Sequence, residues 1–266
     1  MLIEFTKMQG VGNDYIYIDA RKLQIKRPEQ LARKLSDRHF GIGSDGLVLI
    51  LPGADGADVT MGMYNADGSE GMMCGNAVRC VAEWLYERGE VKDKIVRIAT
   101  KSGIKVVRRL SDHYYSVNMG TATVGSTNLE DIHILTTVSI GNPHVVWFPK
   151  FEIKNYNIQR IGQRIEKSKI FPNGTNVEFV RVIDENLLEM RVWERGSGET
   201  LGCGTGACAA AVASVARGFC NREELIRVKL PGGELIVDCS GEQVRLLGPA
   251  VTVYQGTIEI GDNNEN

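Results

Sequence analysis

The chain has 266 residues, of which 43% are hydrophobic, and its formal net charge is −2. This size allows one large domain or two ordinary ones, and the scattered basic residues argue against nucleic acid or an anionic membrane as a partner. No signal-peptide pattern occurs at the N-terminus, and no apolar run reaches the roughly 20 residues of a membrane helix. We therefore expect a cytoplasmic protein whose six cysteines are reduced.

In chain order, hydrophobic periodicity and glycine stops predict two helices and several strands in each half. An amphipathic helix begins at Pro28 and ends before Gly41, and a similar one includes residues 161–165. Two further helices are expected over 76–88 and 205–217, each followed by a glycine that can end a helix. The last contains GACAAAVASVA, which is small and apolar on nearly all sides, so it should be buried inside a sheet. Alternation in HYYSVNM and VTVYQGTIEI predicts strands.

The two halves resemble each other in sequence. At a shift of 129 residues, the separation of Cys74 and Cys203, the two Cys-Gly pairs coincide and GNDYIYID falls on GNPHVVWF. At a shift of 130, DGLVLI falls on TNVEFV and GIKVV on GELIV. Chance agreement among glycine turns is the alternative, but order and spacing hold across most of each half. We expect two homologous halves, residues 1–118 and 119–253, joined near residues 118–128.

Each half places a cysteine between a glycine-rich turn and a helix. Cys74 and Cys203 are therefore expected at helix N-termini, where free N–H groups and the macrodipole favour negative charge. There the thiol pKa, ordinarily roughly 8.5, would be lowered. A substrate carboxylate could bind the N–H groups of the residues that follow. These residues are Gly75, Asn76, Gly204 and Thr205.

Two such thiols could invert an α-carbon, one as base and the other as acid on the opposite face, without any cofactor. The alternative is that the cysteines are small buried hydrophobes. That is the expected role of Cys80, Cys208, Cys220 and Cys239.

Other motifs are discounted. GIGSDG matches the dinucleotide pattern, but it follows a helix and precedes a strand, which is the reverse of what that site needs. The histidines show no zinc-ligand spacing, so no metal is expected. His144 either tunes a thiol or is structural.

Six motifs resemble the diaminopimelate epimerase family over essentially the full length: KMQGVGNDY, RHFGIGSDG, NADGSEGMMCGN, GNPH, GTNVEF and ERGSGETLGCGTGA. The resemblance implies a cofactor-independent two-base epimerase that interconverts LL- and meso-diaminopimelate in lysine biosynthesis. It implies an α+β fold of two homologous halves, each a mostly antiparallel sheet wrapped around a central helix, with the site in the cleft between them. It also implies that the strand 254–266 returns to the first half.

By motif, Cys74 and Cys203 match the catalytic thiols, and the four residues that follow them match the clamp on the reacting carboxylate. The remaining substrate positions are Asn13, Asn65, Asn142, Asn176, Glu194 and Arg195. Arg195 could bind a distal carboxylate with two parallel hydrogen bonds, or it could be a solvated surface residue. The asparagines could instead have a structural role, in which their side chains cap turns. His144 matches a histidine thought to influence the thiols, and Tyr254 matches a position linked to dimer formation. A homodimer acting on a small molecule is implied.

Two positions depart from the family pattern. Ala77 stands where most members carry glycine, and Gly46 stands where some carry glutamine. Another cofactor-free racemase, for example of histidine, and a thiol redox protein remain as alternatives. A substrate with a second amino-acid group is favoured over a single amino acid by Glu194, Arg195 and the asparagines, which could bind that group. The absence of a C-x-x-C motif argues against a thiol redox protein.

Overall fold

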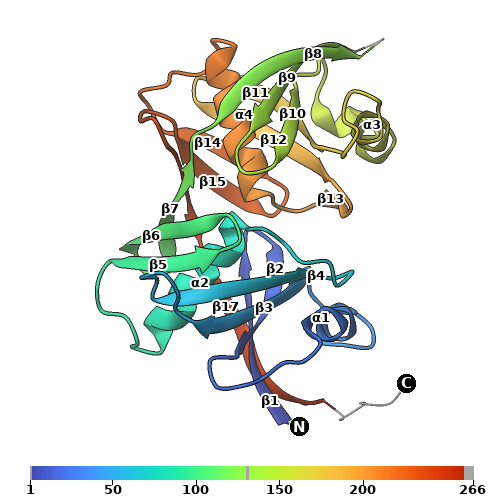
Figure 1. Ribbon diagram of the computed structural model, residues 1–266. Helices are drawn as coiled ribbons and strands as arrows, with labels where there is room; N and C mark the ends of the chain where they lie inside the picture. The colour runs from blue at the N-terminus through green and yellow to red at the C-terminus, as the bar shows by residue number, and fades with distance from the viewer. Residues whose placement is uncertain (1, 130–131, 261–266) are drawn as a thin grey trace. The chain divides into compact units, whose positions relative to one another are not determined.

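The computed structural model describes residues 2–129 and 132–260. The chain divides into two compact units (Figure 1). Unit 1 takes the chain up to Gly10, residues 14–115 and the chain from Ala250 onward, while unit 2 takes residues 11–13 and 116–249. The part of the expected C-terminal strand from position 261 on lies outside the described residues.

Unit 1 combines a mixed sheet with two helices. Its helices are α1 (Pro28–Ser36) and α2 (Gly75–Glu87). Its strands are β1 (Leu2–Gly10), β2 (Asn13–Asp19), β3 (Gly46–Pro52), β4 (Val59–Asn65), β5 (Ile95–Thr100), β6 (Gly103–Ser111) and β17 (Val251–Glu259). β2–β3 and β4–β5 are parallel, whereas β3–β4, β5–β6 and β1–β17 are antiparallel. β7 (Tyr114–Gly120) crosses the boundary between the units.

Unit 2 repeats this arrangement. Its helices are η1 (Ile153–Asn155), α3 (Ile158–Glu166) and α4 (Gly204–Ala216). Its strands are β8 (Thr123–Leu129), β9 (Ile132–Ser139), β10 (Pro143–Trp147), β11 (Asn176–Asp184), β12 (Leu187–Glu194), β13 (Gly198–Thr200), β14 (Ile226–Leu230), β15 (Gly233–Asp238) and β16 (Val244–Pro249). β10–β11 and β12–β14 are parallel, and the pairs β8–β9, β9–β10, β11–β12, β12–β13, β14–β15 and β15–β16 are antiparallel.

Strand register confirms the two homologous halves. Leu47 pairs with Tyr64 in β3–β4, and Val177 pairs with Trp193 at the corresponding place in β11–β12. The partners differ by the same shifts of 130 and 129 residues that align the sequence. The same shifts relate β4–β5 to β12–β14 and α2 to α4. Because register is set by which faces are buried, a shared register reflects a shared core.

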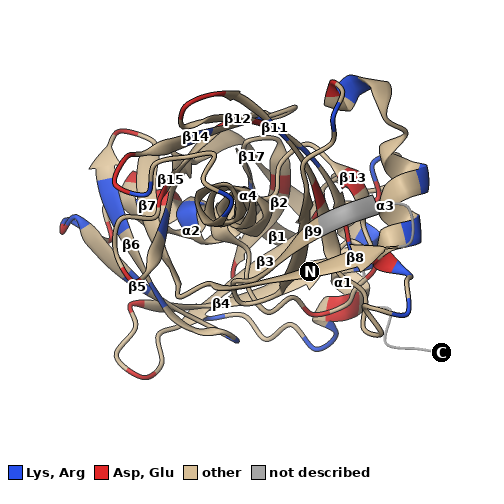
Figure 2. Ribbon diagram, turned by 90° about the horizontal axis from the view of Figure 1, so that it is seen from above, with Lys and Arg blue, Asp and Glu red and all other residues tan. Residues whose placement is uncertain are grey.

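The central helices carry no solvent-facing side. All residues of α4 from Gly204 to Ala211 are buried, and the helix packs against β8–β12 and β14–β16. Figure 2 looks almost along α4, with strands around it. In unit 1, residues 75–85 of α2 are buried, and this helix packs against β1, β6 and β17. A sheet surrounding a small apolar helix is what the sequence predicted.

The outer helices have one buried face. α1 buries Leu31 and Leu35 in a core with β1–β3, and α3 buries Ile158 and Ile165 against β10 and β11. α1 ends earlier than the predicted stop, because the Asp37 carboxylate accepts hydrogen bonds from the backbone N–H groups of His39 and Phe40 and starts a turn.

The stretch 118–128, expected as the join between the halves, consists mainly of strand, the end of β7 and most of β8. Lys and Arg segments and Asp and Glu segments are scattered over the ribbon in Figure 2. Among the described residues, no helix combines the length and apolarity that crossing a membrane requires.

Candidate active site

Cys203 caps the N-terminus of α4. Its backbone is extended, at φ −121° and ψ 114°, and its Sγ accepts the backbone N–H of Gly206 at 3.3 Å. The Thr205 hydroxyl lies 3.5 Å from the same sulfur. Gly204 and Thr205 form the first turn, whose backbone N–H groups have no partner within the helix. The expected cysteine–helix junction is therefore present in unit 2.

Cys203 is only 5% exposed, and this burial has the largest effect on the pKa of its thiol. Burial raises the pKa of the thiol well above its ordinary value, and the nearby carboxylates of Glu194 and Glu178 raise it further. The hydrogen bonds from Thr205 and Gly206 act in the opposite direction but are smaller. The expectation of a lowered pKa is wrong for this thiol, because the loss of hydration outweighs the helix N-terminus.

Glu194, the last residue of β12, is in direct contact with the thiol. Its carboxylate accepts hydrogen bonds from the Cys203 thiol and from the Thr200 hydroxyl. Burial also raises the pKa of the Glu194 carboxyl above its ordinary value. Thiol and carboxyl are thus neighbouring groups, and burial favours the protonated form of each.

A second group reaches Cys203 through Thr205. Asn142, in the turn before β10, donates from Nδ2 to the Thr205 hydroxyl at 3.5 Å and accepts His144 Nε2 at 2.8 Å. The other ring nitrogen of His144 lies 2.7 Å from Glu178 Oε1 on β11. The predicted residues Asn142, His144 and Thr205 are therefore joined in one network, and His144 is linked to Cys203 through it.

Arg195 follows directly after Glu194. Its backbone N–H donates to Asn176 Oδ1 at 2.9 Å, and its guanidinium donates to the Asn173 carbonyl at 3.0 Å. The side chain is exposed and lines a surface hollow of ≈ 570 Å³ together with Lys167. No carboxylate in the described part of the chain pairs with this guanidinium, so it can accept one from a ligand.

In unit 1, Cys74 caps α2 with the same extended backbone, at φ −134° and ψ 123°, and is half-buried. Gly75 and Asn76 form the first turn of the helix. Arg79, one turn further on, is fully buried and donates to Asn76 Oδ1 at 2.7 Å. This bond holds the amide oxygen of Asn76 toward the guanidinium of Arg79.

The structure places the remaining predicted residues, Asn13, Asn65 and Tyr254, on three strands. Asn13 begins β2 and belongs to the short segment that clusters with unit 2. Asn65 ends β4, and its side chain donates to the Ser69 hydroxyl at 2.9 Å. This contact caps a turn, which is the structural role given above as the alternative to substrate binding. Tyr254 on β17 is 43% exposed and meets Phe5 edge-on.

Both departures from the family pattern lie in tightly packed positions. A Cβ on Gly46 would lie 2.2 Å from the Tyr64 carbonyl oxygen, so no side chain fits there. Ala77 is fully buried in α2, where its carbonyl accepts the Tyr17 hydroxyl at 3.4 Å.

Sequence reasoning missed two charged residues that hold site residues in place, Glu178 and Arg79. Both are completely buried. The available signal was a single charge inside an apolar run, in TNVEFV and in GNAVRCVA. Because buried charges need partners, such a residue indicates an unseen contact.

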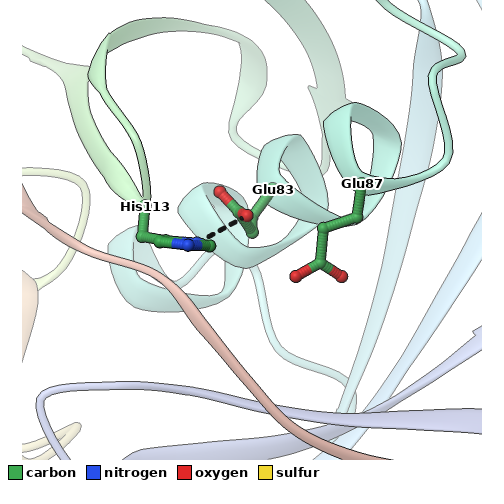
Figure 3. Close-up of side chains that lie close together, drawn as sticks. All are labelled: Glu83, Glu87 and His113. Atoms are coloured by element: carbon green, nitrogen blue, oxygen red, sulfur yellow. Dashed lines mark hydrogen bonds and ion pairs between the residues drawn. The ribbon is translucent and has the colours of Figure 1, made fainter.

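One group of side chains within the described ranges has the composition of a metal site (Figure 3). Glu83, Glu87 and His113 each offer one ligand atom, all within 4.8 Å of one another. However, Glu83 accepts hydrogen bonds from Tyr115 and pairs with His113 Nδ1 at 2.8 Å, while Glu87 accepts Thr252 at 2.8 Å. The carboxylates already have protein partners, so we assign this group to fastening α2 to β7 and β17.

Gly206 leaves room for the site. A Cβ there would lie 2.9 Å from Glu178 Oε1 and 3.2 Å from Cys203 Sγ. We expect Gly206→Ala to lower turnover at least about tenfold through displacement of these atoms. Its stability should change little, since alanine gains roughly 0.5–1 kcal/mol over glycine in a helix and offsets the strain. Thermal unfolding and initial rates measure the two effects.

Gly241→Ala is the matched control, since its Cβ would meet nothing closer than the Gln243 carbonyl at 3.8 Å. Equal loss of activity in both variants would contradict the steric explanation.

A solved structure of another protein has the same overall fold as this chain. The solved structure of a phenazine biosynthesis protein of the PhzF family from Bacillus anthracis superposes with a TM-score of 0.78, covering 98% of this chain and all of that one at 18% identity. This places the protein in the class of two-unit folds in which each unit wraps a sheet around one helix.

The family is defined by sequence. The family model for diaminopimelate epimerase matches residues 5–125 and 136–260. A diaminopimelate epimerase from Desulfovibrio desulfuricans is 46% identical, covering 96% of this chain and 97% of the relative. One from Acetivibrio thermocellus is 43% identical, covering 98% and 100%. The chain belongs to the diaminopimelate epimerase family.

Proposed function

We propose that the protein is a cofactor-independent epimerase that interconverts LL- and meso-diaminopimelate in lysine biosynthesis. The observation that carries the proposal is the repeated junction at Cys74 and Cys203. Each cysteine caps a buried central helix whose first turn presents backbone N–H groups. Family membership over almost the whole chain supports the choice of substrate.

In the proposed reaction, one thiol from each unit acts on the same α-carbon. A thiolate removes the α-proton while the other thiol delivers a proton to the opposite face. As the proton leaves, negative charge spreads onto the substrate carboxylate, and the N–H groups at the helix starts stabilise that charge. Burial raises the pKa of the Cys203 thiol, which favours its protonated form. The two thiols exchange the roles of acid and base between the two directions of the reaction.

The second amino-acid group of diaminopimelate, which carries the distal carboxylate, binds in this proposal to side chains that follow β12. Arg195 binds the distal carboxylate, with its backbone held by Asn176. A guanidinium suits this task because it binds a carboxylate with two parallel hydrogen bonds.

The test is proton NMR of the reduced protein in heavy water. LL-diaminopimelate, meso-diaminopimelate, histidine and proline are offered separately, and loss of the α-proton signal is followed. We expect exchange with both diaminopimelate isomers and with neither of the others. Exchange with histidine or proline alone would keep the thiol chemistry and reject the substrate. No exchange with any of the four would reject the proposal.

We further propose a cytoplasmic homodimer that uses the outer face of β17, where Val251, Val253 and Tyr254 are exposed. An exposed apolar group of this kind is typical of a contact surface. Light scattering should give twice the chain mass, and Tyr254→Lys should shift it toward the monomer. If the Tyr254→Lys variant stays dimeric, the dimer contact does not involve this face of β17.

A further inference from the structure

Glu166, the last residue of α3, holds the turn that carries Glu194 and Arg195. Its Oε2 accepts the indole N–H of Trp193 at 2.7 Å, and its Oε1 accepts the backbone N–H of Gly196 at 3.3 Å. These two donors stand on either side of the pair in the chain. One carboxylate therefore fixes the turn at both ends of the pair.

The carboxylate is carried by a helix that lies very close to β12. A Cβ on Gly162 of α3 would lie 2.4 Å from the Cβ of Trp193, so glycine alone fits there. Ile158 and Ile165 of the same helix belong to a buried core, and the Trp193 side chain packs against that core. The place of Glu166 is thus set by a packed helix, which holds a side chain more precisely than a loop does.

The Arg195 side chain runs from this turn along the loop that follows α3. Its backbone N–H donates to Asn176 Oδ1, and a Cβ on Gly174 would lie 2.8 Å from its Cδ. Its Nη1 donates to the Asn173 carbonyl at 3.0 Å, and no other protein partner of the guanidinium occurs among the described residues. The N–H donors that remain can bind a carboxylate, and their place depends on how firmly the turn is held.

Unit 1 fastens the corresponding turn by different chemistry. The shift of 129 residues places Ala66 where unit 2 has Arg195. There a base of the outer helix, Arg33 of α1, donates from Nε to the Asp67 carbonyl at 2.6 Å. In unit 2 an acid of the outer helix accepts two N–H groups instead. The double tether thus occurs in the unit whose turn presents a guanidinium.

We propose that Glu166 is a positioning residue for the proposed reaction: by fixing the turn at both ends, it holds the Arg195 guanidinium where it meets the distal carboxylate of the substrate. The inference rests on the proposed function. Two parallel hydrogen bonds require both donors to point at the carboxylate, so a loose turn would have to be ordered at the expense of binding free energy. Glu166 acts through Arg195 and takes no part in the proton transfers, so its loss should raise KM and leave kcat nearly unchanged.

The first test needs no turnover. Glu166→Gln keeps the shape of the side chain but leaves a single oxygen for two N–H groups. Hydrogen exchange followed by mass spectrometry should show the amides of residues 194–198 exchanging at least about tenfold faster than in the unaltered protein. Glu185→Gln, at an exposed carboxylate in the turn before β12, is the matched control and should change nothing in this segment. Equal exchange in Glu166→Gln and the unaltered protein would overturn the proposal, whatever the substrate proves to be.

The second test is steady-state kinetics with both diaminopimelate isomers. Glu166→Gln should raise KM about tenfold while kcat changes by less than about threefold, since it weakens only the binding of the distal carboxylate. Glu185→Gln should leave both constants unchanged. An unchanged KM in Glu166→Gln, or a loss confined to kcat, would overturn the proposal. If the unaltered protein turns over neither isomer, the proposed function fails and the role toward the substrate fails with it, even where the exchange result holds.

A double-variant cycle tests the route through Arg195. In the Arg195→Met background, Glu166→Gln should raise KM by less than about twofold, because the guanidinium that it positions is already gone. Trp193→Phe, which removes the indole N–H and keeps an aromatic ring against Gly162, should raise KM as Glu166→Gln does. Full multiplication of the Glu166 and Arg195 effects would show that Glu166 does not act through Arg195 and would overturn the proposal.

Discussion

Cys203→Ala is expected to abolish epimerisation while leaving the protein folded. In the proposed reaction, the thiol supplies or takes the proton on one face of the α-carbon. Glu194 contacts the thiol, but its carboxylate is tied to Thr200. We expect a loss of at least about 10⁴-fold in kcat, the scale on which catalytic residues of this kind act. The heavy-water assay with both isomers measures it.

Cys74→Ala should be equally damaging, because epimerisation needs both faces. Cys220→Ala is the matched control: this cysteine is also buried and lies in unit 2, beyond the end of α4. It should keep activity within a few-fold, as expected for a small hydrophobe. Substantial turnover in either Cys74→Ala or Cys203→Ala would reject the two-base assignment.

Arg195→Met is expected to remove recognition of the distal carboxylate. Within the described residues the guanidinium has no carboxylate partner, and methionine keeps the aliphatic packing of the side chain against Gly174 without the charge. Loss of a bidentate charged contact should lower kcat/KM for diaminopimelate by about 10²–10³-fold, mostly through KM. Steady-state kinetics with each isomer would show this.

Lys167→Met is the matched control, since Lys167 lines the same hollow as Arg195. It should change kcat/KM by less than about threefold, as an exposed charge with no assigned contact to the substrate. An Arg195→Met enzyme with unchanged KM would show that the second head binds elsewhere.

Most of the fold could be predicted because the chain repeats itself. The shift of 129 residues predicted two similar halves, and glycines at the ends of apolar runs bounded α2 and α4 to within one or two residues. The small apolar sequence of α4 predicted a helix surrounded by a sheet. These features are local, since each depends on periodicity, propensity and turn chemistry within a short window.

The contacts of the candidate site depended on strand neighbours. His144 and Glu178 are 34 residues apart, and only the parallel pairing of β10 with β11 puts them side by side. Nothing in the spacing of the two residues indicates that pairing. Arg79 was within reach of prediction, because it lies one helical turn from Asn76, but its role depends on the sheet that buries α2.

By itself, the sequence determined the duplication, the helices and the cysteine at the start of each central helix, since turns and helix ends are properties of neighbouring residues. Only the tertiary structure decided the protonation chemistry of Cys203. A helix N-terminus alone would lower the thiol pKa, but burial and the carboxylates of Glu194 and Glu178 raise it. Burial and charge contacts come from segments that are distant in the chain, and the desolvation they impose outweighs the local dipole.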